Sequence, residues 1–251
     1  GFGFASSRLP RGLSLALGSA DLPPLEMTNA YAVLANGGYQ VTPWFIERVT
    51  RGDDDTLVEE ATPTIVCRDC REGQAEVEVD GRRHPVAPRV VDPIAAYILT
   101  DMLRDVIESG TGRAALELGR DDIVGKTGTT NDQRDAWFAG YNADLAVTVW
   151  VGKDNNETIA EYGANAALPV WIDFMRDALN GRPEAKHAAP AGLVTARVDP
   201  NSGRRLADGQ GGGMSELFHP DHLPSAQPRR VEREVEQHSG SQGTGAYEAI
   251  F

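Results

Sequence analysis

Three strand candidates that follow one another closely constrain the fold of this chain most. They are residues 122–127, 136–141 and 144–152, and only Asn142 and Ala143 separate the last two. A connection of two residues suits a tight hairpin. Strands joined by short turns pair antiparallel, because parallel pairing needs a long crossover connection. The sequence therefore predicts an antiparallel sheet and not a series of alternating βαβ units.

Amphipathic helices are predicted before and after these strands. Apolar residues recur at helical spacing in residues 24–36, 92–108 and 168–180, and a short helix is expected at 113–118. Asp92 followed by Pro93 is a suitable N-cap and first helical position, and Pro169 is expected near the start of the last helix. Helices on both sides of an antiparallel sheet indicate an α+β fold in which the sheet is sandwiched.

The sequence between the first two helices is less regular. Residues 41–50 read as an edge or irregular strand because of an early proline, and a second short strand is expected at 56–60. Residues 61–90 carry many charges and little periodicity, so we interpret them as a surface insertion with a hairpin around Asp80-Gly81. Its Cys67 and Cys70 suggest a local disulfide or a pair of thiols, since a zinc site needs further ligands.

Periodicity fades after the last predicted helix. Residues 209–213 are rich in glycine, and residues 227–237 are strongly polar. Such composition is typical of a mobile or loosely packed segment. We therefore expect one domain portion over residues 1–180 and a C-terminal extension over 181–251.

Charge and hydropathy exclude some functions. The chain has 37 Asp and Glu against 24 Lys and Arg, a formal net charge of -13. Such a surface repels phosphates, so nucleic acid is not an expected partner. The sequence has no apolar run approaching the length of a membrane span. It also begins without Met or a charged leader, so it reads as if it starts inside a longer protein, where an upstream membrane anchor is possible.

The residues most suggestive of chemistry are Lys126, Thr127, Gly128 and Thr129, at the end of the first predicted strand. Strand side chains alternate, so the hydroxyls of Thr127 and Thr129 share one face. Gly128 lets another backbone approach closely, and Lys126 adds a positive charge. If the strand lies at a sheet edge, the Thr129 N–H is free to stabilise an oxyanion. The pattern predicts a slot for an extended peptide or an amide ring that ends in a carboxylate.

A phosphate-binding loop is the competing reading of the same residues. Gly125, Lys126 and Thr127 match the end of that motif, but it requires a glycine where this chain has Arg120. It also requires a helix after the lysine, and strand signals follow instead. A Lys-Thr-Gly that merely closes a strand on a solvated surface stays possible.

Residues 124–141 resemble the Lys-Thr-Gly strand and following hairpin of class A high-molecular-weight penicillin-binding proteins, within the serine β-lactamase and penicillin-binding transpeptidase superfamily. Ordered similarity extends over about residues 10–180. It includes residues 13–20, 24–38, 110–114, 149–152 and 168–175. The resemblance is thus more specific than one tripeptide.

The resemblance implies a peptidoglycan D,D-transpeptidase with an upstream glycosyltransferase, anchored at the periplasmic face of the bacterial inner membrane. Its partners would be D-Ala-D-Ala stem peptides and β-lactams, without a cofactor or metal. Lys126, Thr127 and Thr129 would hold the substrate carboxylate. Gly128 would give clearance, and the Thr129 N–H would form half of the oxyanion hole. The neighbouring Trp137 and Trp150 are expected to be core aromatics.

Two further motifs of the family are absent. The positions three residues before the three lysines are Ile123, Trp150 and Pro183, so there is no Ser-x-x-Lys. None of the ten serines has Asn two positions later. The simplest interpretation is an N-terminally truncated domain without its serine nucleophile. We predict that this chain alone neither transpeptidates nor binds penicillin covalently.

Two alternatives remain open. One is a fragment of a D,D-carboxypeptidase or serine β-lactamase, and the other is a non-catalytic peptide- or partner-binding module. An incomplete sheet would also leave apolar faces uncovered, so the isolated chain is expected to be prone to aggregation or to need its missing half.

Overall fold

The computed structural model describes residues 2–71, 73–207 and 209–226. The chain divides into two compact units. The first comprises the residues up to Val194 together with Leu217–His222, and the second comprises Thr195–Glu216 and the described residues from Leu223 on. Residues 227–237, predicted to be loosely packed, lie outside the described part. No helix within the described part is long and apolar enough to cross a membrane.

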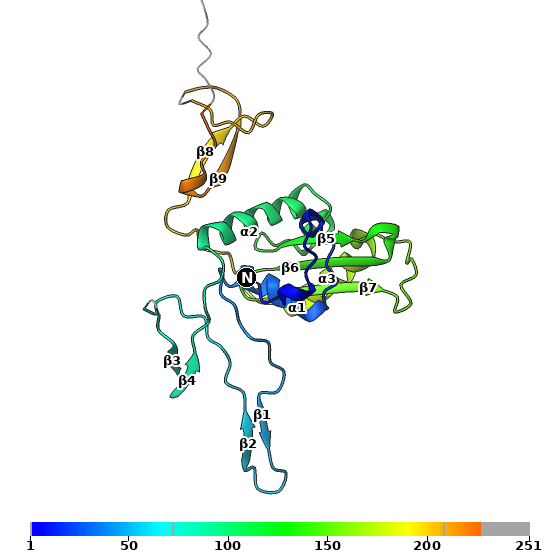
Figure 1. Ribbon diagram of the computed structural model, residues 1–251, viewed down its shortest axis with the longest axis vertical. Helices are drawn as coiled ribbons and strands as arrows, with labels where there is room; N and C mark the ends of the chain where they lie inside the picture. The colour runs from blue at the N-terminus through cyan, green and yellow to red at the C-terminus, as the bar shows by residue number, and fades with distance from the viewer. Residues whose placement is uncertain (1, 72, 208, 227–251) are drawn as a thin grey trace, which may run out of the picture. The chain divides into compact units, whose positions relative to one another are not determined.

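The first unit is built on a three-stranded antiparallel sheet (Figure 1). Its strands are β5 (Val124–Thr129), β6 (Asp135–Tyr141) and β7 (Ala146–Gly152), in the order β5-β6-β7. The predicted antiparallel sheet is therefore confirmed. The β6–β7 turn is longer than the two residues expected. It is held by Asn142, whose side-chain oxygen accepts hydrogen bonds from the N–H groups of Asp144 and Leu145.

Helices cover both faces of this sheet, as predicted. One face packs against α3 (Gly163–Ala178) and the 3₁₀ helix η3 (Arg113–Leu118), with Phe138 and Trp171 in the shared core. The other packs against α1 (Pro24–Ala35) and α2 (Pro93–Glu108), with Tyr141 and Val124 in a second core. Phe138 and Tyr141 lie on opposite faces because side chains alternate along β6.

The helix starts follow local chemistry with one exception. The Asp92 carboxylate accepts hydrogen bonds from the N–H groups of Ile94 and Ala95, so the predicted N-cap of α2 is confirmed. The last predicted helix begins earlier than expected, at Gly163, and Pro169 lies inside it. Buried Ala167, Leu168, Trp171 and Met175 favour this longer helix, because their packing offsets the lost hydrogen bond at Pro169.

Two separate hairpins lie between α1 and α2 in the sequence. The strands β1 (Arg48–Thr50) and β2 (Leu57–Glu60) pair with each other, as do β3 (Glu76–Val79) and β4 (Arg82–Pro85). Only the last three residues of the strand expected at 41–50 are extended in a sheet. The hairpin predicted at Asp80-Gly81 is confirmed, and both turn residues have positive φ, 51° and 76°. Cys67 and Cys70 form a disulfide.

The part of the chain after α3 also contains regular structure. The strands β8 (Val194–Val198) and β9 (Met214–Phe218) form a two-stranded sheet. The remaining 3₁₀ helices of the described residues are η1 (Ser6–Arg8), η2 (Leu13–Leu17), η4 (Asn131–Gln133) and η5 (Pro220–His222). The boundary predicted at residue 180 stays a prediction, and the first compact unit extends past it to Val194.

Candidate substrate-binding edge

Strand β5 lies at one edge of the three-stranded sheet of the described chain. Hydrogen bonds alternate along an antiparallel pair, so every second residue points its N–H and C=O away from the partner strand. The Thr130 N–H donates to the Asp135 carbonyl at 3.1 Å, which fixes this alternation for the β5–β6 pair. Thr129 is the next residue back along β5, so its N–H faces away from β6. Sequence reasoning made a free Thr129 N–H conditional on an edge strand, and that condition is met.

The hydroxyls of Thr127 and Thr129 lie on the α3 face of the sheet, and both have partners. Thr127 Oγ1 is 2.6 Å from Thr111 Oγ1, in the loop between α2 and η3. Thr129 Oγ1 accepts a hydrogen bond from the Gly163 N–H at 3.0 Å. Gly163 is the first residue of α3, whose N-cap Tyr162 makes no side-chain capping bond. Thr129 therefore caps α3 from outside the helix, and the positive end of the helix dipole points at the site.

Lys126 lies on the opposite face from these hydroxyls. Its exposed side chain reaches round the edge, and Nζ donates to the Thr127 carbonyl at 2.8 Å. The Thr127 carbonyl also points away from β6, by the same alternation as the Thr129 N–H. The positive charge thus reaches the edge through a contact with the backbone of Thr127.

Two glycines allow the site to form. A Cβ at Gly163 would lie 2.5 Å from the carbonyl oxygens of both Gly128 and Trp137, so α3 can approach the strands only with glycine there. A Cβ at Gly128 would lie 3.1 Å from Trp137 Cβ. Packing against Trp137 is therefore one reason why position 128 requires glycine. The clearance for a substrate backbone predicted at this residue stays a prediction.

The turn after Thr129 is closed by polar contacts. The Asp135 N–H donates to Thr130 Oγ1 at 2.8 Å, and the Asp135 carboxylate accepts from Trp150 Nε1 at 2.9 Å. Trp137 and Trp150 stack as a tilted pair with ring centroids 6.1 Å apart. Trp150 is 38% exposed, so its expected place in the core is wrong. Its indole N–H needs a polar partner, which Asp135 supplies on the sheet surface.

A buried carboxylate holds the start of β5. The side chain of Asp122 accepts hydrogen bonds from Arg120, from Asn142 Nδ2 and from the Ala185 N–H. Burial would raise the pKa of Asp122, but these three donors outweigh it, and the pKa lies below its usual range. The charged carboxylate therefore ties together β5, the β6–β7 turn and the segment after α3.

Sequence reasoning identified the strand but missed two of its contacts. Thr111 and Gly163 lie 16 and 34 residues from their partners Thr127 and Thr129. Thr111 lies within residues 110–114, which carry part of the family resemblance, and Gly163 precedes the last helix predicted at 168–180. Their closeness to β5 depends on tertiary packing, which periodicity does not report.

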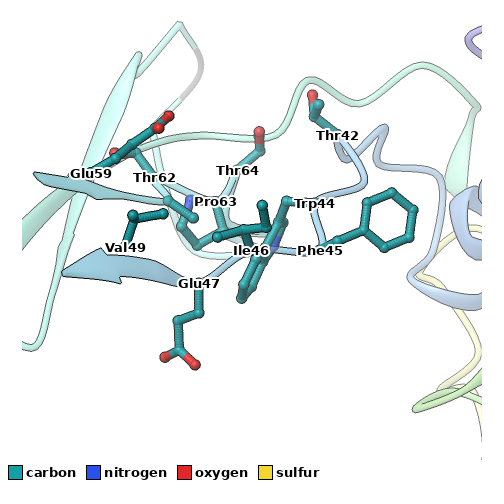
Figure 2. A pocket seen from close by; sticks show the side chains of 11 residues that line it. Thr42, Trp44, Phe45, Ile46, Glu47, Val49, Glu59, Thr62, Pro63 and Thr64 are labelled. Atoms are coloured by element: carbon teal, nitrogen blue, oxygen red, sulfur yellow. The ribbon is translucent and has the colours of Figure 1, made fainter. Parts of the chain in front are cut away.

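One hollow of the described surface lies away from this edge. It measures about 400 Å³ and is formed by the base of the β1–β2 hairpin (Figure 2). Its lining includes apolar residues, among them Trp44, Ile46 and Pro63, and the acidic residues Glu47 and Glu59. None of the β5 residues lines it.

Comparison with known proteins identifies the relatives of the chain. Residues 11–176 match the family described as the penicillin-binding protein transpeptidase domain. Penicillin-binding protein 1A of Pseudomonas aeruginosa is 42% identical over 252 residues, which cover 89% of this chain and 31% of that protein. Penicillin-binding protein 1A of Neisseria cinerea is 41% identical over 197 residues, which cover 78% of this chain and 22% of that protein.

A solved structure has the same fold. The 2.6 Å crystal structure of penicillin-binding protein 1A from Haemophilus influenzae superposes with a TM-score of 0.78 at 33% identity, covering 90% of this chain and 36% of that one. The chain spans about a third or less of the length of these relatives. On the strength of the family match over residues 11–176, the chain belongs to the penicillin-binding protein transpeptidase domain family.

Proposed function

We propose that this chain supplies the substrate-binding edge of a peptidoglycan D,D-transpeptidase, acting within a longer protein that carries the serine nucleophile. The observation that carries the proposal is the outward-facing Thr129 N–H, flanked by two hydroxyls and the Lys126 ammonium. An N–H donor beside a cluster of O–H and ammonium donors suits a substrate with a reacting carbonyl close to a carboxylate. The C-terminal D-Ala-D-Ala of a stem peptide has both groups.

The chemistry assigns these residues separate roles. The serine oxygen would attack the carbonyl of the penultimate D-Ala, an ester would form, and the terminal D-Ala would leave with the proton released by the serine. The amine of a second stem peptide would then attack the ester and free the serine. The Thr129 N–H would stabilise the oxyanion of both steps. Lys126, Thr127 and Thr129 would hold the terminal carboxylate, and a β-lactam would occupy the same edge.

The surroundings of the enzyme are part of the same proposal. Peptidoglycan lies outside the bacterial inner membrane, so the longer protein would work at the periplasmic face of that membrane. It would be held there by a segment upstream of this chain and would carry a glycosyltransferase domain. The relatives named penicillin-binding protein 1A support this arrangement, since each is more than three times as long as the matched part.

The experiment is labelling by a fluorescent penicillin. We expect the full-length gene product to be labelled in a gel and the 251-residue chain to stay unlabelled, because it lacks Ser-x-x-Lys. Lys126→Ala should slow labelling about a hundredfold, since it removes a charged donor from the site. Lys153→Ala is the matched control, because Lys153 is exposed and 3.7 Å from Glu157.

Two results would overturn the proposal. One is a full-length product that penicillin does not label at all, in which case a non-catalytic binding module accounts for the chain better. The other is a Lys126→Ala variant labelled at the wild-type rate, which would leave the enzyme class intact but remove this edge from the site.

A further inference from the structure

The side chain of Thr111 contacts the substrate-binding edge but is not among the groups proposed to bind the substrate. It lies in the loop between α2 and η3, it is exposed, and its Oγ1 is 2.6 Å from Thr127 Oγ1. This bond joins β5 to a segment 16 residues earlier in the chain. The hydroxyl is therefore at the edge, although the residue belongs to neither the strand nor its hairpin.

Packing fixes the position of this loop. Thr111 lies between Gly110 and Gly112, and both glycines fold back onto the last turn of α2. A Cβ at Gly110 would lie 2.9 Å from Val106 Cα, and one at Gly112 would lie 3.1 Å from the Val106 carbonyl oxygen. The Gly112 N–H donates to that same oxygen at 2.9 Å. The loop is thus held against the helix, and Thr111 is presented to Thr127 by a constrained backbone.

Counting hydrogens shows what the Thr111 hydroxyl changes. A hydroxyl has one proton to donate and two lone pairs to accept with. Thr129 Oγ1 accepts from the Gly163 N–H, which leaves its own proton for a ligand. Thr111 and Thr127 have two protons between them and use one in their mutual bond. When Thr111 is the donor, the Thr127 proton is left to point outward, beside that of Thr129.

We infer that Thr111 is a positioning residue for the substrate carboxylate, acting through Thr127. When Thr111 donates to Thr127 Oγ1, the Thr127 hydroxyl proton remains available to donate to the carboxylate. The same bond polarises the Thr127 O–H further. Thr111 should therefore favour an anionic group over a neutral one at the position of the substrate carboxylate. The inference rests on the proposed function, since it assumes that a carboxylate binds at this edge.

A purely structural reading predicts something different. If the Thr111–Thr127 bond only holds the loop against the sheet, its loss would affect all ligands of the site equally. A role in carboxylate recognition would affect only ligands that carry the charge. Benzylpenicillin and its methyl ester form such a pair, because they differ only in that group.

The test measures the second-order rate of acylation of the full-length gene product by both compounds. Thr111→Val, which removes the hydroxyl and keeps the shape, should lower the rate with benzylpenicillin about tenfold, as expected for a lost bond to a charged group. The rate with the ester should stay the same within about twofold. Thr111→Ser should recover the rate with the acid. The ratio of the two rates within one variant cancels any loss of folded protein.

Two controls keep the result interpretable. Thr28→Val removes another threonine hydroxyl, one that donates to the Pro24 carbonyl within α1, and should change neither rate. In a double-mutant cycle, Thr111→Val should cost nothing further once Thr127→Val is present, because Thr111 then has no partner to act through. This cycle uses the acid alone and tests whether Thr111 acts through Thr127, while the comparison of acid with ester separates carboxylate recognition from a structural role.

The outcomes separate the two proposals. Equal losses with acid and ester, no loss with either, or additive effects of the two substitutions would overturn the role of Thr111 and leave the transpeptidase proposal standing. Failure of the wild-type protein to react with benzylpenicillin would overturn the proposed function and this inference with it.

Discussion

The β5–β6–β7 sheet and the β1–β2 hairpin contain similar residues in opposite surroundings. At the sheet, Phe138 of β6 and Trp171 of the covering helix α3 are fully buried and pack edge to face, with centroids 4.9 Å apart. In and beside the hairpin, Trp44 is 48% exposed and Phe45 is 82% exposed, around the hollow shown in Figure 2. Aromatic content alone therefore does not say which part of this chain forms a core.

The difference follows from the number of neighbours that each strand has. Strand β6 is central, with a partner on each side and helices on both faces (Figure 1). Five of its seven residues are therefore buried. Strands β1 and β2 have only each other, and most of their residues are exposed. An isolated two-stranded hairpin is at best marginally stable in water. The sheet should therefore carry most of the folding energy of the first unit, with the hairpin contributing little.

The largest effect is expected from truncating the same residue type in the two regions. Trp171→Ala should reduce the free energy of unfolding by about 3–5 kcal/mol, because it empties a core position and also removes the Nε1 hydrogen bond to the Val147 carbonyl. Trp44→Ala, on the exposed side, should change it by less than about 0.5 kcal/mol. Denaturant unfolding followed by circular dichroism measures both. Equal losses would mean that the hairpin aromatics are part of the cooperative core.

A second pair of substitutions compares a glycine packed against neighbouring backbone with a glycine that has open space around it. Gly163→Ala places a methyl group against the carbonyl oxygens of Gly128 and Trp137, and should cost about 1–3 kcal/mol by forcing α3 away from the sheet. Gly52→Ala, in the β1–β2 turn, meets no atom within 4 Å and should be nearly neutral. Thermal unfolding gives both values. A neutral Gly163→Ala would show that α3 can withdraw from Thr129 without loss.

Comparing these regions also shows how far the sequence predicts the structure. Hydrophobic periodicity and turn residues identified β5, β6, β7 and the N-cap Asp92. Helix caps, and strands that are joined by short turns, are determined by residues nearby in the sequence. The same signals did not find the start of α3, where an interior Pro169 is compensated by burial of Trp171 and Met175. Long-range packing decides that helix start.

The candidate site divides in the same way. Lys126, Thr127, Gly128 and Thr129 were named from sequence because they are consecutive and their alternation follows from the strand. Thr111 and Gly163 were not, because each meets the strand only through tertiary contact. The exposed position of Trp150 was also missed, since the sequence does not show that Asp135 offers its indole a partner at the surface.

The smallest effect concerns pH and a histidine that packs with the sheet. His187 contacts the Tyr141 ring edge to face, and its Nε2 lies 2.8 Å from the Ala35 carbonyl oxygen. Burial lowers the pKa of His187 below its ordinary value, and the positive charges of Arg104 and Arg68 lower it further. The hydrogen bond with the Ala35 carbonyl acts in the opposite direction but is the smaller effect. In the unfolded chain this histidine therefore binds a proton at a higher pH than in the folded chain.

The sign of the pH dependence follows from that difference. Below about pH 6.5 the unfolded state binds more protons than the folded state, so stability should fall with acidification, by at most about 1.4 kcal/mol per pH unit. His187→Gln retains an N–H that can donate to the Ala35 carbonyl and removes the titration, so its unfolding free energy should vary less between pH 7.5 and 5.5. Denaturant unfolding at several pH values compares the two proteins. Identical slopes would mean that His187 is protonated equally in both states, and that its packing against Tyr141 tolerates a charge that the sheet core should exclude.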